Sequence, residues 1–193
     1  MADPRPNPLG VDRFEFIEYA AADGGALRSL FESMGFTAVA RHRSKAATLY
    51  RQGDISFVLN EEPDSFASDF VAQHGPRCTG FALRVDDAQQ AHAHCIERGA
   101  RPVTIKPDSV PVATPMIEGI GGSILYLVSG DDVFSDFEPI VGVDQHPVGF
   151  GMTFIDHLTH NVVNGNMDEW ARSTPSCSAS TRSSTSTSAA PRR

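Results

Sequence analysis

Large apolar residues alternate with other residues in "FEFIEYA" (14–20), a period of two that is typical of a β-strand. An amphipathic helix is predicted next, because Asp23 can cap it and apolar residues follow at i, i+3, i+4 and i+7, at Leu27, Leu30, Phe31 and Met34. Gly35 is expected to end this helix in a left-handed conformation, and "FTAVARH" (36–42) then resumes as a strand.

The same order of elements returns further along the chain. "GFALRV" (80–85) is a strand, Asp87 caps a second helix, Gly99 ends it, and "RPVTI" (101–105) is the next strand. The narrow apolar face of this helix is formed by Ala88, Ala91 and Cys95. The spacing from cap to glycine is the same in both copies, which indicates an internal repeat.

Each copy continues with a hairpin. The first turns near Gly53-Asp54 and aligns Ile55, Phe57 and Leu59 on one face; the second turns at 119–122 and returns with Ile124, Tyr126 and Val128. Each unit therefore consists of a strand, a helix and about three strands, and two such units can pair their sheets under their helices. The predicted fold class is α+β, with units at about 11–75 and 76–140 inside one domain that spans 11–150.

A third unit begins after the linker "VGVDQHPVGFG" (141–151). Its strand is "MTFID" (152–156), Asn166 is its expected helix cap, and the helix face opens with Met167, Trp170 and Ala171. The pattern then stops, and residues 173–193 are mostly Ser, Thr, Ala, Pro and Arg. We interpret 151–172 as the start of a further domain, 173–193 as a disordered tail and the Pro-rich residues 1–10 as a flexible arm.

Composition narrows the possible partners. A formal net charge of −8 argues against nucleic acid, which favours clustered Lys and Arg. No apolar run approaches the roughly 20 residues of a membrane span, and "MADPRPNPLG" has no hydrophobic signal-peptide core. The three cysteines lack the spacing of a disulfide framework, so a reducing cytoplasm is the expected location.

Metal-ligand residue types gather in "DHLTHN" (156–161), at the end of the third unit's strand. Two histidines three apart, His157 and His160, favour a metal only if a third protein ligand joins them; the alternative is ordinary surface or hydrogen-bonded histidines. The group His92, His94 and Cys95 is a weaker candidate, because i and i+2 diverge on a helix. His42 is expected on a solvated strand face, and "EGIGGS" is expected to be a turn rather than a phosphate loop.

Several strings together resemble bacterial 4-hydroxyphenylpyruvate dioxygenases. They are "GFTAVARHRSKAATLYRQGDISFVLNEEPDSFA", "EGIGGSILYLV", "GVDQHPVGFGMTFIDHLTHNV" and "GNMDEWA", and the similarity runs from about residue 10 to 171. That family belongs to the vicinal oxygen chelate superfamily, which is built from paired strand-helix-strand-strand-strand modules. The resemblance thus implies two complete modules and a third that has begun, in agreement with the repeat.

The resemblance also implies an activity. Family members convert 4-hydroxyphenylpyruvate, an aromatic 2-oxo acid, and dioxygen to homogentisate and carbon dioxide in tyrosine catabolism, and they commonly form oligomers. Their Fe(II) is held by two His and one Glu, with open positions for the substrate and dioxygen. The family's first ligand carries over onto His157, whereas His160 is not a ligand in that pattern. The other two ligands lie further downstream in the family, so this chain is expected to retain no iron and to be inactive.

The tail carries a hypothesis of its own. If Phe and Ile codons such as TTC and ATC are read one base late, they give Ser, and TAC and GAC give Thr, which matches residues 173–188 against the family's continuation. A frameshift is therefore one reading of the tail, and a genuine disordered linker is the other. Two further readings of the whole chain stay open, a non-catalytic small-molecule-binding protein of the superfamily and a fragment of a 4-hydroxymandelate synthase.

Overall fold

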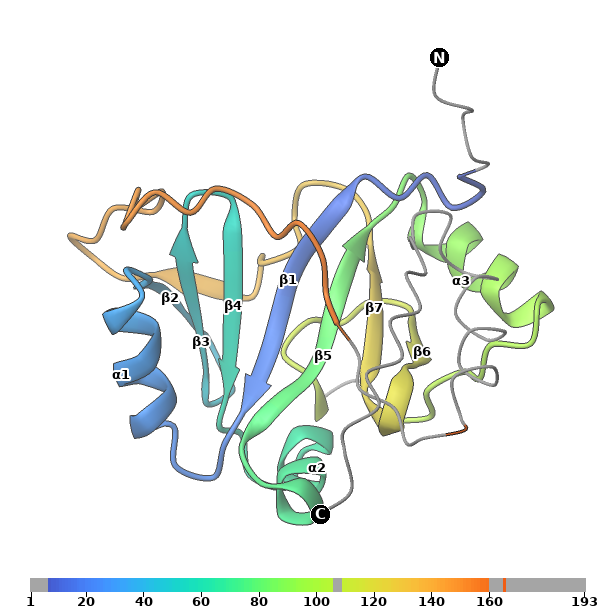
Figure 1. The fold of residues 1–193 in the computed structure, drawn as a ribbon, viewed down its shortest axis with the longest axis horizontal. Helices are drawn as coiled ribbons and strands as arrows, with labels where there is room; N and C mark the ends of the chain where they lie inside the picture. Colours follow the sequence, from blue (N-terminus) through green and yellow to red (C-terminus); the bar gives the residue numbers. More distant parts are fainter. Residues whose placement is uncertain (1–6, 106–108, 160–164, 166–193) are drawn as a thin grey trace, which may run out of the picture.

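The computed structural model describes residues 7–105, 109–159 and 165, and its strands join into one eight-stranded mixed sheet (Figure 1). Along the chain the elements are β1 (Arg13–Ala20), α1 (Gly25–Ser33), β2 (Thr37–His42), β3 (Ala47–Gln52), β4 (Ile55–Asn60), α2 (Phe66–His74), β5 (Arg77–Arg84), α3 (Ala88–Glu97), β6 (Met116–Glu118), the 3₁₀ turn η2 (Ile120–Gly122), β7 (Ile124–Val128) and β8 (Phe137–Pro139). The strand order across the sheet is β6-β7-β5-β1-β4-β3-β2-β8.

The predicted repeat is confirmed by the way the strands pair. In the first unit β1 runs parallel to β4, and in the second unit β5 runs parallel to β7. The two units meet where β1 and β5 pair antiparallel at the centre of the sheet. Each unit therefore places its first strand at the shared seam and its last strand beside it.

The strand register divides the sheet into two apolar faces. Phe16 pairs with Ala82 and Ala82 with Tyr126, so these three side chains share one face, which is covered by parts of 103–112 and 133–143. Ile17 pairs with Phe81 and Phe57, so these lie on the opposite face, where α1 and α3 pack. Both helices thus cover the same face, one over each unit.

Helix ends follow the sequence closely. The Asp87 side chain accepts hydrogen bonds from the backbone N–H groups of Gln89 and Gln90, both at 2.9 Å, as a capping residue does. Gly35 and Gly99 end α1 and α3 at φ +88° and +94°, a conformation that favours glycine. At α1 the cap is shifted by one residue: Gly24 is the N-cap, while Asp23 accepts a hydrogen bond from the N–H of Gly25.

The helix α2 is absent from the sequence-based assignment. Ser65 caps it and forms a reciprocal capping box with Ser68, in place of the Glu or Gln that usually marks this motif. Only Ala67 and Val71 of α2 are buried. Its apolar face is therefore too narrow to give a clear helical period.

Two predicted strands are wrong. Residues 101–105 make only an isolated bridge between Pro102 and Ile117, because proline has no N–H to donate to a ladder. Residues 152–156 form no strand, since their backbone bonds to the β3–β4 turn rather than to an edge of the sheet.

The chain ends of the domain differ in part from expectation. Residues 7–10 were predicted to be part of a flexible arm, but Leu9 is buried against the α3 side of the sheet and the Asn7 side chain bonds the backbone of Val11. Residues 166–171, with the expected helix of the third unit, and the tail at 173–193 lie outside the described residues. None of the described helices is long and apolar enough to cross a membrane.

Candidate functional site

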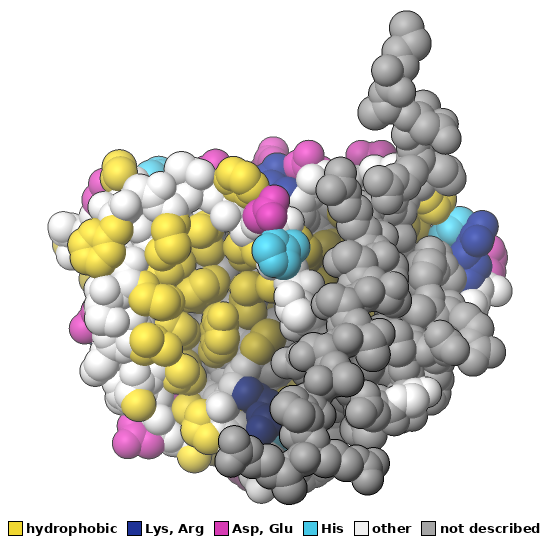
Figure 2. All heavy atoms as spheres, viewed as in Figure 1, with side chains coloured by type: hydrophobic (Ala, Val, Ile, Leu, Met, Phe, Trp, Pro, Cys, Tyr) yellow, Lys and Arg dark blue, Asp and Glu magenta, His cyan; other side chains and the backbone are white. Residues whose placement is uncertain are grey.

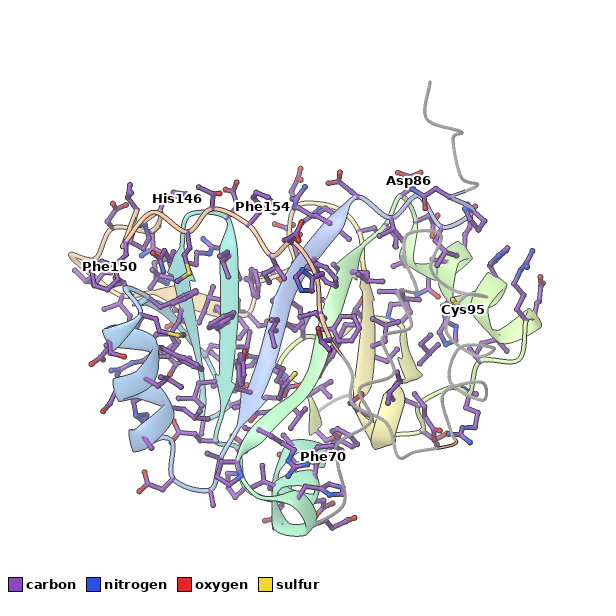
Figure 3. All side chains as sticks on the ribbon, in the orientation of Figure 1. Phe70, Asp86, Cys95, His146, Phe150 and Phe154 are labelled. Carbon is purple, nitrogen blue, oxygen red and sulfur yellow. The ribbon has the colours of Figure 1, made fainter. Side chains whose placement is uncertain are left out.

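Residues 147–155, which we call the strap, lead from the two-unit fold to His157. The strap crosses the ends of the strands at the β3–β4 turn, along the top of Figure 3, where Phe150 and Phe154 are labelled. Its backbone is fixed by the β3–β4 turn: the N–H groups of Gly53 and Asp54 donate to the carbonyls of Pro147 and Thr153 at 2.9 and 3.1 Å. The strap is therefore held through backbone groups, with Phe150 and Phe154 left largely exposed.

Gln52 holds the middle of the strap. Its side chain is fully buried at the end of β3, and its Nε2 donates to the carbonyl of Met34 at 2.9 Å. Its Oε1 accepts hydrogen bonds from the N–H groups of Phe150 at 2.6 Å and Met152 at 3.4 Å. One amide thus connects the end of α1 to two backbone N–H groups of the strap.

Close approach of the strap depends on Gly149. Its φ of +55° lies in the left-handed region, and a Cβ there would be 2.3 Å from the carbonyl oxygen of Gly35 and 2.6 Å from the Gln52 amide. Glycine is the residue that fits this contact without displacing backbone.

His157 follows the strap and is held by its neighbours. Ile155 and Leu158 pack against the apolar face beside α1, part of which is turned toward the viewer in Figure 2. The Nδ1 of His157 lies 2.9 Å from Oδ2 of Asp156, and the two side chains are 76% and 79% exposed. If Nδ1 donates to Asp156, Nε2 keeps a free lone pair that faces solvent, the arrangement of a metal-binding imidazole.

The described residues do not complete a metal centre around His157. His160 lies outside them, and within 7–105 and 109–159 no group of three His, Cys, Asp or Glu side chains is placed to hold a metal ion. One imidazole supplies one ligand, whereas a ferrous facial triad needs three. The described residues therefore supply at most one ligand for such a centre.

The other histidines predicted from sequence do not form a site either. His92 and His94 lie on different sides of α3, and Cys95 is fully buried under that helix. His42, predicted to face solvent, is instead only 7% exposed, because β8 packs beside it. The strand that buries it comes from the distant second unit, which the local sequence pattern does not indicate.

A buried polar cluster at the seam between the units was missed by sequence reasoning. The Glu18 carboxylate accepts hydrogen bonds from Asn60 Nδ2 and from the Tyr126 hydroxyl, each at 2.7 Å, and the Thr79 hydroxyl donates to the Glu18 carbonyl at 3.5 Å. All four residues are at most 2% exposed. The period of two in "FEFIEYA" puts Glu18 on the same face as Phe16, and that was the available signal.

Burial shifts the pKa values of the two titratable side chains in this cluster, Glu18 and Tyr126. It raises the pKa of the Glu18 carboxyl, and the hydrogen bonds from Asn60, Tyr126 and Thr79 oppose that rise. Burial, and then the negative charge of Glu18, raise the pKa of Tyr126 well above its ordinary value. The phenol is therefore a permanent hydrogen-bond donor.

Two small hollows lie away from these groups. One of about 290 Å³ is lined by loop residues that include Asp131, Asp132 and Asp136, and one of about 260 Å³ is lined by Phe66, Val103 and Ile124 among others. Neither borders His157, and both fall below the size usual for a drug-sized ligand. Neither of these two hollows is therefore a candidate site next to the strap.

Residues 6–146 match the family model described as the N-terminal domain of hydroxyphenylpyruvate dioxygenase. The chain belongs to the hydroxyphenylpyruvate dioxygenase family. The resemblance seen in the sequence is thereby confirmed, and so is the vicinal oxygen chelate type of fold.

Individual relatives of the chain support its assignment to the hydroxyphenylpyruvate dioxygenase family. The 4-hydroxyphenylpyruvate dioxygenase of Pseudomonas sp. (strain P.J. 874) is 49% identical over 88% of this chain, and hemolysin VllY of Vibrio vulnificus is 47% identical over 86%. A solved structure of a xylose isomerase-like TIM barrel/4-hydroxyphenylpyruvate dioxygenase fusion protein matches 91% of this chain and 28% of its own, at 32% identity and a TM-score of 0.78. The alignments cover 49% of each of the two sequence relatives, so the chain spans about half their length.

Proposed function

We propose that this chain supplies the amino-terminal half and the first iron ligand, His157, of a cytoplasmic 4-hydroxyphenylpyruvate dioxygenase. The intact enzyme would convert 4-hydroxyphenylpyruvate and dioxygen to homogentisate and carbon dioxide. The family match over residues 6–146 carries the proposal, because it covers both units of the fold. The exposed imidazole directly after Asp156 supports the assignment of the ligand.

In this proposal the chain's residues position one corner of the site. The hydrogen bonds of Gln52 and the β3–β4 turn fix the strap, and Nδ1 of His157 lies beside the Asp156 carboxylate, which leaves Nε2 as the nitrogen for a metal. Ferrous iron, when bound by three protein ligands, supplies open positions for the 2-oxo acid and dioxygen. A single imidazole cannot hold that ion at useful occupancy, so the 193-residue chain is expected to be inactive alone.

Two proteins test the proposal. One is the 193-residue chain, and the other joins residues 1–159 to the aligned remainder of the Pseudomonas sp. relative. Homogentisate is measured after incubation with ferrous iron, ascorbate and 4-hydroxyphenylpyruvate. We expect turnover from the joined protein and none above background from the chain alone.

A matched pair of substitutions in the joined protein tests the ligand. His157→Ala should abolish turnover and stoichiometric iron binding. His146→Ala, also an exposed histidine and just before the strap, should leave both unchanged. An active His157→Ala protein would refute the ligand assignment, and a folded, iron-loaded joined protein that makes no homogentisate would refute the proposed reaction.

A further inference from the structure

His42 is buried at one edge of the sheet, where the second unit reaches back to the first. It is the last residue of β2, and its register partner is Phe137 at the start of β8. The two rings meet edge to face, with centroids 5.1 Å apart and planes at 79°. The imidazole therefore forms part of the contact that seats β8 on β2.

The hydrogen bonds of His42 fix its protonation state. Its Nδ1 is 3.2 Å from the backbone nitrogens of Ser44 and Lys45, and both N–H groups point to it. Because Nδ1 accepts, it carries no hydrogen, and the neutral ring carries its hydrogen on Nε2. Among the described residues that buried Nε2 has no hydrogen-bond partner.

A protonated His42 does not fit this place. The added hydrogen on Nδ1 would face two N–H donors, and the Nε2–H would still lack an acceptor. The positive charge would also be buried against Phe137. The buried position of His42 against Phe137 therefore accommodates only the neutral imidazole.

The charged groups around His42 act on its protonation in both directions. Lys45 and Arg43 in the following turn disfavour the imidazolium, while Asp136 before β8 and Glu62 after β4 favour it. Arg43 lies 3.4 Å from the Asp136 carboxylate, and Glu62 accepts a hydrogen bond from the N–H of Ala46 at 2.6 Å, so both carboxylates are already engaged. Burial is the largest influence, and the pKa of His42 is lowered.

β8 is held by a short ladder, by backbone bonds at its two ends and by the Arg43 side chain, which donates to the Ser135 carbonyl and lies beside the Asp136 carboxylate. Its ladder with β2 covers only residues 137–139, and Pro139 has no N–H to contribute. At its two ends Arg43 N–H donates to the Asp136 carbonyl at 2.9 Å, and Ile140 N–H donates to the Val39 carbonyl at 2.8 Å. Phe137 also covers the apolar face that holds Val39 and Ala40.

We propose that His42 is a pH-sensitive latch, whose protonation in acid expels the ring from its buried place and releases β8 from the edge of β2. The latch is independent of the dioxygenase activity proposed above, because it uses residues of the two-unit fold alone. Release would uncover the apolar face under Phe137.

Hydrogen exchange of the 193-residue chain tests the latch. Amide exchange is measured by mass spectrometry at pH 7.5 and 5.5, with intrinsic rates corrected for pH. With the ordinary histidine pKa of 6.5 in the released state and a lower pKa in the closed state, release becomes more favourable from pH 7.5 to pH 5.5, by at most about tenfold. We expect corrected exchange at Arg43 and Ile140 to rise, by up to about tenfold, while the β1–β4 ladder changes little.

Substitutions connect that response to His42. His42→Phe keeps a ring against Phe137, and His42→Asn keeps an acceptor for the Ser44 and Lys45 N–H groups, but neither side chain titrates. Both should lose the pH response. His94→Asn is the matched control, because His94 also has a buried Nε2 without a partner among the described residues, and it should keep the response.

If one of the two variants at position 42 fails to fold, the other still shows whether the pH response of exchange depends on His42. A pH response that persists in a folded variant at position 42 would refute the latch. So would a wild-type chain in which Arg43 and Ile140 show no acceleration, or in which every ladder accelerates equally.

Discussion

At the scale of single residues, the feature that costs the fold most free energy is a carboxylate buried at the centre of the sheet. Among the described residues no Lys, Arg or His pairs with Glu18, and its stabilisation comes from neutral donors, chiefly Asn60 and Tyr126. Each unit contributes one of these donors, Asn60 from β4 and Tyr126 from β7. The cluster therefore ties the two units together where β1 and β5 meet.

Tyr126→Phe tests whether the hydrogen bond from Tyr126 to Glu18 helps to hold the two units together. The substitution removes one hydroxyl that bonds a buried carboxylate and leaves no cavity, so the free energy of unfolding should fall by about 1.5–3 kcal/mol. Urea unfolding followed by circular dichroism measures it. Tyr50→Phe is the control, because Tyr50 is also buried, at 2% exposed, and its hydroxyl is not one of the groups that bond Glu18. An equal loss from both substitutions would contradict the role given to the Tyr126–Glu18 bond.

At the scale of elements, the sequence predicts those strands, helices and turns that are determined by the local hydrophobic period and by capping residues. The strands β1 and β5, both helices of the repeat and both hairpin turns were found from alternation, caps and glycines. The predictions fail where contacts with a segment distant in sequence determine the local structure or the burial of a residue. Residues 152–156 alternate like a strand yet bond to Gln52 and the β3–β4 turn, and His42 is buried by β8 from the other unit.

The same reasoning applies to the candidate site. His157 could be predicted as a ligand because the family motif is local, and that role stays a prediction; its exposed position beside Asp156 follows from the strap. Glu18 was missed because its hydrogen-bond donors come from β4 and β7. A pattern of apolar positions shows which face a side chain takes, but it does not show which polar groups converge there.

Gln52→Leu tests whether one amide holds the strap. The substitution keeps a similar volume but leaves the Met34 carbonyl and the Phe150 N–H without their partner, so unfolding should become easier by about 1–3 kcal/mol. Hydrogen exchange at Phe150 should also accelerate. Gln89→Leu, at an exposed position of α3, should change neither quantity. Unaltered exchange at Phe150 in Gln52→Leu would show that the strap is held by other contacts.

At the scale of the whole molecule, two buried groups make stability respond to pH in opposite directions. Burial raises the pKa of Glu18 above 4.5, so the folded state keeps a proton that the unfolded chain has released, and this stabilisation is lost as pH rises through the folded pKa. Burial lowers the pKa of His42 below 6.5, so the unfolded chain takes a proton that the folded state refuses, and stability is lost as pH falls below 6.5.

Above pH 4.5 the Glu18 contribution falls as pH rises toward its folded pKa, and below pH 6.5 the His42 contribution falls as pH drops toward its folded pKa, so single substitutions should separate the two effects. Relative to the wild type, Glu18→Gln should lose stability more steeply in acid, and His42→Phe less steeply, each by up to about 1.4 kcal/mol per pH unit. The change in slope of the double variant should be the sum of the two single changes. Urea unfolding at pH 4.5, 5.5, 6.5 and 7.5 gives the slopes, and taking differences from the wild type cancels the shared contribution of the exposed carboxylates. If either single variant runs parallel to the wild type across this range, the group it lacks does not couple protonation to folding.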